Sequence, residues 1–138
     1  MRRDERNRFD QLFERVYQAL PADLLARLEE TPVVLEDHPS PALLEELGIP
    51  DDEGLCGLHS GMPLTERSVQ HSHLPDVITL FREGILDEAG GWEPWVDDDG
   101  QPWGGEEAVL REIRITLLHE IGHHFGLDED DLDALGYA

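Results

Sequence analysis

Apolar side chains recur at helical spacing in the first part of the chain and again in its last third. Over residues 4–20 they fall three or four positions apart, with arginines and acidic residues between them, which predicts an amphipathic helix. Pro21 interrupts this pattern and is expected to open a second short helix that reaches Leu28. The stretch 106–125 is apolar on almost every side, so we expect a central, buried helix that ends at Gly126.

Shorter apolar runs lie between these helices. Predicted strands cover residues 31–36, 57–61 and 77–81. The run 77–81, Val-Ile-Thr-Leu-Phe, gives the strongest strand signal in the chain. The segment 41–47 predicts a short helix closed by Gly48. The segment 92–105 is rich in Gly, Pro, Asp and Trp, and is interpreted as an ordered loop or irregular hairpin.

Length and composition narrow the class of protein. A chain of 138 residues is expected to form a single domain over 1–138 with a real core. Its 32 acidic residues outnumber 10 basic ones, all arginines, to give a net charge of −22. That charge repels nucleic acid and anionic membranes, so neither is an expected partner. Cys56 is the only cysteine, and neither a signal peptide nor a membrane span is apparent, so the expected compartment is the cytoplasm.

The motif H-E-x-x-H lies within the long C-terminal helix, as His119, Glu120 and His123. Residues four apart share one face of a helix, so both imidazoles are placed to bind one cation. Beside them, the Glu120 carboxylate is placed to hold a metal-bound water and to accept its proton as the water attacks a carbonyl. His124 points about 100° away around the helix, and is interpreted as a surface residue or a support to the ligands, not as a ligand itself.

A catalytic zinc usually has three protein ligands and one open position, so a third ligand is expected after the helix. Gly126 allows the backbone to turn back toward the metal. Glu129 stands ten positions after His119, where the metzincin pattern H-E-x-x-H-x-x-G-x-x-H has its third ligand, and is the first candidate. Asp128 and Asp130 are alternatives, because a one-residue change in the turn would exchange them. Alternatively, these acids only cap a following helix.

The string over residues 119–127, near the C-terminus of a small acidic chain, resembles the minimal zincin-like metallopeptidase family of bacteria. The resemblance covers most of the chain, although only the last third carries specific motif residues. It implies an α+β fold: a compact zincin-like domain whose small mixed sheet packs against N-terminal helices and a buried active-site helix. It also implies Zn²⁺ at His119 and His123 and an acidic third ligand, typically Asp, where Glu129 stands.

In zincins, an extended substrate adds as an antiparallel strand to a sheet edge above the metal. The segment 77–81 is either that edge or an ordinary core strand. A group that stabilises the oxyanion is also required. The sequence offers five candidates without choosing among them: Tyr137, His71, His73, Arg82 and Arg114.

The leading hypothesis is therefore a zinc-dependent peptidase that acts on a peptide or protein, with Glu120 as general base. The alternative is a non-catalytic, metal-stabilised protein-binding module with a zincin fold, which the small size of the chain favours. Small endoribonucleases of the rRNA-maturation type also have ligands at these offsets. They lack a Glu after the first histidine, and the charge of −22 opposes RNA binding.

Overall fold

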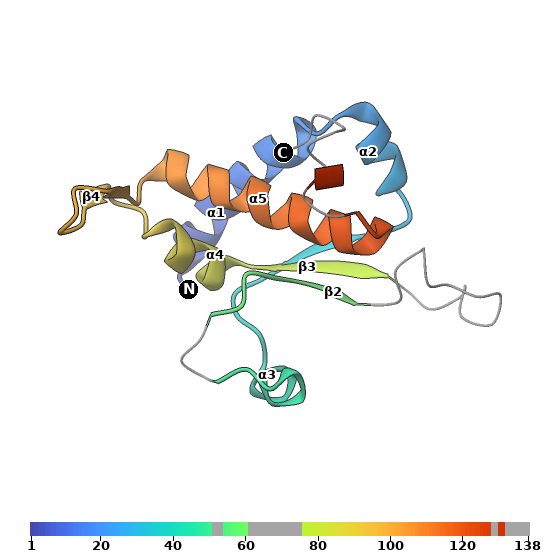
Figure 1. Cartoon of the computed structure of the whole chain (residues 1–138), viewed down its shortest axis with the longest axis horizontal. Coiled ribbons are helices and arrows are strands. Elements are labelled where there is room, and N and C mark those ends of the chain that lie inside the picture. Colours follow the sequence, from blue (N-terminus) through green and yellow to red (C-terminus); the bar gives the residue numbers. More distant parts are fainter. Residues whose placement is uncertain (51–53, 61–75, 128–129, 132–138) are drawn as a thin grey trace.

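The computed structural model describes residues 1–50, 54–60, 76–127 and 130–131. Its helices are α1 (Arg3–Gln18), α2 (Ala22–Arg27), α3 (Pro41–Leu47), α4 (Arg82–Ala89) and α5 (Glu106–Phe125). Its strands are β1 (Val33–Glu36), β2 (Gly57–Ser60), β3 (Val77–Phe81), β4 (Trp95–Val96) and β5 (Pro102–Trp103). Helices combined with small sheets confirm the expected α+β fold class (Figure 1).

Three strands form a mixed sheet in the order β1-β3-β2. β1 runs parallel to β3, whereas β2 runs antiparallel to it, with His59 opposite Ile78. β3 is therefore the central strand, and its Ile78 and Leu80 side chains are fully buried. Burial on the central strand explains why this run of β-branched and apolar residues gave the strongest strand signal.

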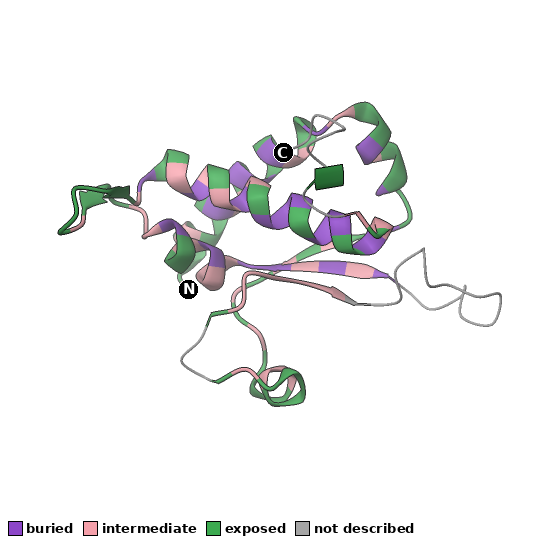
Figure 2. Cartoon of the chain, viewed as in Figure 1, coloured by how far each residue is buried: buried purple, intermediate pink, exposed green. Residues whose placement is uncertain are grey.

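The helices α1 and α5 pack against each other on one face of the sheet (Figure 1). Their buried residues form stripes that face inward, whereas α3 has no buried residue (Figure 2). The common core combines both helices with β3 and α4, and includes Phe9, Leu12, Phe13, Val16, Ile78, Leu80, Ile85, Val109, Ile113, Leu117 and Ile121. Each such side chain stabilises the fold by roughly 1.5–3 kcal/mol when fully buried.

The helix α5 has the bounds that its apolar pattern predicts, and it ends at Gly126, whose φ of 70° is left-handed. The expectation that it is buried almost all round is wrong on one side, because Ile115 is 51% exposed. The sheet and α1 cover two faces of the helix, and the third faces solvent. None of the helices in the described ranges is long and apolar enough to cross a membrane.

The helix α4 follows β3 without a loop and was not predicted from the sequence. Ile85 and Ala89, four residues apart, are its buried positions. Gly84 in its first turn packs so closely against the backbone carbonyl of Leu55 that a Cβ at this position would collide with it. Glycine at this position therefore allows α4 to pack closely on the backbone of Leu55, and the helix continues past it.

The predicted irregular hairpin at 92–105 is confirmed as the two-stranded pair β4–β5. Its Trp95 and Trp103 rings stack with centroids 6.1 Å apart. The Asp97 carboxylate accepts hydrogen bonds from the backbone N–H groups of Asp99 and Gln101 at 2.9 Å, and so closes the turn.

Ion pairs join the N-terminal helix to the segment after β1 and to α4. Arg6 donates two hydrogen bonds, of 3.0 and 2.8 Å, to the Asp37 carboxylate. Arg82 donates to Asp37 at 3.1 Å and to Asp10 at 2.8 Å. These contacts lower the pKa of the Asp37 carboxyl, first through the Arg6 hydrogen bond. Three segments distant in sequence are thus held together by charge-assisted hydrogen bonds.

Candidate metal centre

The last turns of α5 bring His119, Glu120 and His123 together. The two imidazole rings meet edge to face with centroids 4.3 Å apart. One potential ligand atom from each of the three residues lies within 4.8 Å of the other two. Both histidines are exposed, whereas Glu120 is 5% exposed. The arrangement is therefore a pair of accessible nitrogen donors with a buried carboxylate beside them.

The carboxylate of Glu120 has one oxygen facing His123, with 3.6 Å between Oε1 and Nδ1. Its Oε2 is buried and has no hydrogen-bond partner among the described residues. Burial raises the pKa of the Glu120 carboxyl, and the imidazoles of His123 and His119 act in the opposite direction. A buried carboxylate oxygen with an open hydrogen-bonding capacity fits a neighbouring cation and its water. These residues therefore suit a metal ion such as the zinc expected from the sequence.

The strand β2 lies directly against this carboxylate. A Cβ placed on Gly57 would lie 2.9 Å from Thr116 Cγ2 and 3.0 Å from Glu120 Cγ. Thr116 and Glu120 lie one turn apart on the face of α5 that packs on β2. A methyl group at position 57 would therefore force the Thr116 or Glu120 side chain to shift.

The structure decides between the two interpretations of residues 77–81. They form β3, which pairs with both β1 and β2, so they are a core strand and not an edge strand. Among the described strands, the edge on the side of the metal centre is β2, which packs on α5 and carries Gly57 beside Glu120. The signal that was overlooked is the glycine at the start of the shorter predicted strand.

The candidate third ligands fall mostly outside the described ranges. Glu129, the first candidate, and Asp128 both lie outside these ranges. Asp130 is described, exposed and helical. The assignment of the third ligand stays a prediction.

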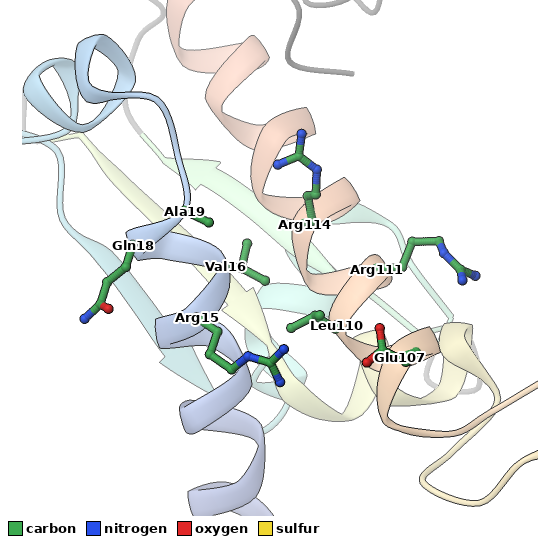
Figure 3. A pocket seen from close by; sticks show the side chains of 8 residues that line it. All are labelled: Arg15, Val16, Gln18, Ala19, Glu107, Leu110, Arg111 and Arg114. Atoms are coloured by element: carbon green, nitrogen blue, oxygen red, sulfur yellow. The ribbon is translucent and has the colours of Figure 1, made fainter.

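Of the five candidate oxyanion stabilisers, Tyr137, His71 and His73 also lie outside the described ranges. Arg82 is engaged by Asp10 and Asp37 at the N-terminal ion pairs. Arg114 lines a different hollow, between α1 and α5 (Figure 3).

That hollow has a volume of about 680 Å³ and none of its lining residues belongs to the H-E-x-x-H motif. Its walls are formed by the second half of α1 and the first half of α5 (Figure 3): Arg15, Val16, Gln18, Ala19, Glu107, Leu110, Arg111 and Arg114. It is thus separate from the metal centre.

His124 is buried, with 3% exposure, so the interpretation as a surface residue is wrong. Its Nε2 lies 3.2 Å from Thr31 Oγ1, and its Nδ1 lies 3.2 Å from His59 Nε2. A second group of side chains that could hold a metal consists of His59, Asp76 and His124. Sequence reasoning missed it, because its members lie far apart in the chain and meet only through the pairing of β2 with β3.

Most of the chain matches the model of one known protein family. A family model described as zincin-like metallopeptidase matches residues 28–137. The matched region includes β1 to α5 and the entire H-E-x-x-H motif. Among curated proteins, none matches the chain.

Proposed function

The chain belongs to the zincin-like metallopeptidase family, and on this premise we propose that it is a zinc-dependent peptidase that cleaves extended polypeptide. The observation that carries the proposal is the buried Glu120 carboxylate beside two exposed imidazoles.

His119 and His123 are proposed as zinc ligands, with Glu129 as the third and Asp128 or Asp130 as alternatives. Two neutral imidazoles and one carboxylate leave a zinc centre with net positive charge. When bound, zinc acidifies water and polarises a substrate carbonyl. The exposure of both histidines supports this role, because a catalytic site keeps an open position.

Glu120 is proposed as the general base. It accepts a proton from the attacking water and then delivers that proton to the nitrogen of the departing amine. Its position supports the role, because the buried carboxylate lies directly beside the two proposed ligands, within reach of a water that the ion would hold. The buried Oε2, which has no partner among the described residues, is the oxygen proposed to do this.

The substrate is proposed to bind as an additional strand along the edge of β2, antiparallel to it. Backbone hydrogen bonds would then supply most of the affinity, with little dependence on side chains. The contact of Gly57 with Glu120 supports this placement, because it brings the backbone of the edge strand next to the proposed base.

The test compares the wild-type chain with Glu120→Gln, both loaded with Zn²⁺, against an unstructured protein such as casein and a mixed peptide library. We expect cleavage by the wild type, at least a hundredfold less by the variant, and equal zinc content in both. His38→Gln, at an exposed histidine, is the matched control and should cleave normally. If neither form cleaves any substrate while both bind the same polypeptide, the non-catalytic binding module is the correct function.

A further inference from the structure

A second cluster of side chains that could hold a metal includes His124, the residue next to the H-E-x-x-H motif. His59 comes from β2, Asp76 immediately precedes β3, and His124 lies near the end of α5. One potential ligand atom of each lies within 4.8 Å of the other two. His124 is 3% exposed, and the side chains of His59 and Asp76 are 5% and 7% exposed. Two imidazoles and a carboxylate therefore converge in the interior.

The distances within this cluster suit a shared cation. His59 Nε2 lies 3.2 Å from His124 Nδ1 and 3.5 Å from Asp76 Oδ1. Two atoms bonded to one tetrahedral zinc at about 2.0–2.1 Å lie about 3.3 Å apart. A charge-assisted hydrogen bond between an imidazolium and a carboxylate would be shorter, at about 2.7–2.9 Å. The separation of His59 from Asp76 is thus that of two ligands of one ion, rather than that of a strong hydrogen bond.

Thr31 orients the His124 ring for this role. Its hydroxyl lies 3.2 Å from His124 Nε2, and both residues are buried. When Nε2 carries the proton and donates it to Thr31 Oγ1, the Nδ1 that faces His59 keeps its lone pair. Metal-binding histidines characteristically donate their other ring N–H in this way, which fixes both the tautomer and the ring orientation.

We propose that His59, Asp76 and His124 form a second, structural Zn²⁺ site. The ion binds His59 Nε2, His124 Nδ1 and Asp76 Oδ1, and joins β2, the start of β3 and α5. Three protein ligands leave one position for a water, but burial keeps substrate away from this ion, unlike at the exposed pair His119 and His123. The ion would therefore stabilise the fold instead of performing catalysis. Imidazole and carboxylate ligands select a divalent transition metal over Mg²⁺ or Ca²⁺.

The test counts zinc per chain by elemental analysis, after loading with Zn²⁺ and dialysis against excess Mg²⁺ to strip exposed carboxylates. We expect two ions in the wild type, and one each in Asp76→Asn and in His59→Gln. His38→Gln, the exposed-histidine control, should keep two. A zinc count in both site variants equal to that of the wild type would overturn the proposal and leave only a buried hydrogen-bonded network.

The double variant His119→Gln/His123→Gln separates this proposal from the proposed function. It should lose one ion and keep the second. If it keeps both while Asp76→Asn loses one, the proposed catalytic centre fails and the structural site stands.

A measurement on the unsubstituted chain applies if the variants do not fold. Histidine ring ¹⁵N resonances are compared between the chelated and Zn²⁺-loaded wild type. We expect the resonances of His59 Nε2 and His124 Nδ1 to shift with zinc. Unchanged resonances for both nitrogens would contradict the site.

Discussion

Gly57 of β2 and Glu120 of α5 are in direct contact, so that a Cβ on Gly57 would lie 3.0 Å from Glu120 Cγ. The same Cβ would lie 2.9 Å from Thr116 Cγ2, whose branched side chain has little freedom to move aside. The position of the proposed base therefore depends on the absence of one methyl group on the neighbouring strand.

The substitution Gly57→Ala is expected to displace the Glu120 carboxylate and to lower kcat/KM for peptide cleavage roughly tenfold to a hundredfold. Zinc content should stay unchanged, because the substituted residue carries no ligand. Gly54→Ala is the matched control, since its Cβ would come no closer than 3.7 Å to Gly84 Cα. Equal loss of activity in both variants would show that the contact with Glu120 does not position the base.

Two isoleucines on α5 allow a test of how the helix is packed. Ile113 is fully buried, whereas Ile115 is 51% exposed. We expect Ile113→Ala to lower the free energy of unfolding by about 2–4 kcal/mol, because it leaves a cavity in the common core. Ile115→Ala should lower it by less than about 0.5 kcal/mol. Urea unfolding followed by circular dichroism measures both, and similar losses would contradict the packing described for this helix.

The ion pairs of Asp37 make a pH-dependent contribution to stability. Because Arg6 and Arg82 lower the pKa of this carboxyl, the folded state favours its charged form. The resulting stabilisation is present above the ordinary carboxyl pKa of about 3.9 and is lost as the pH falls through the lower pKa of the folded state.

We therefore expect the free energy of unfolding of Asp37→Asn to lie below that of the wild type at pH 7, and the two values to converge below about pH 3. Urea titrations at several pH values measure this difference. Asp98→Asn, at an exposed position of the hairpin turn, should match the wild type throughout. A constant difference for Asp37→Asn from pH 7 to pH 3 would exclude this linkage.

Cys56 is expected to react slowly in the folded chain. Burial, followed by the charges of Glu88 and Glu112, raises the pKa of its thiol to about 11. Because only the thiolate is nucleophilic, alkylation by iodoacetamide at pH 8 should be roughly a hundredfold slower in the native protein than in urea. Mass spectrometry of time points gives both rates. Equal rates would mean that neither burial nor the neighbouring acidic side chains raise the pKa of this thiol.

Local sequence patterns predicted correctly those features that depend on residues close together in the chain. The bounds of α3 follow from Ser40, whose hydroxyl accepts a hydrogen bond from the Leu43 N–H at 3.1 Å, and from Gly48 with a φ of 71°. The histidines of H-E-x-x-H converge because one helical turn fixes their spacing. Both features depend on residues within about five positions of each other.

Contacts between distant segments were not predictable in this way. Gly84 lies inside α4, where the Leu55 carbonyl leaves no room for a side chain, and this requirement comes from a residue 29 positions earlier in the chain. His59 and Asp76 meet His124 only after the register between β2 and β3 is set. That register cannot be predicted from a local pattern, because it depends on which face of each strand is buried in the core.

The helix α1 precedes the part of the chain that matches the family model, which begins at residue 28. It nevertheless supplies Phe9, Leu12, Phe13 and Val16 to the core that α5 shares. A fragment that starts at residue 28 would expose the apolar surface of α5 that α1 covers. Such a fragment would tend to aggregate or to be degraded by proteases. Expression trials guided by the family boundary alone would thus discard the helix that packs against the helix carrying the H-E-x-x-H motif.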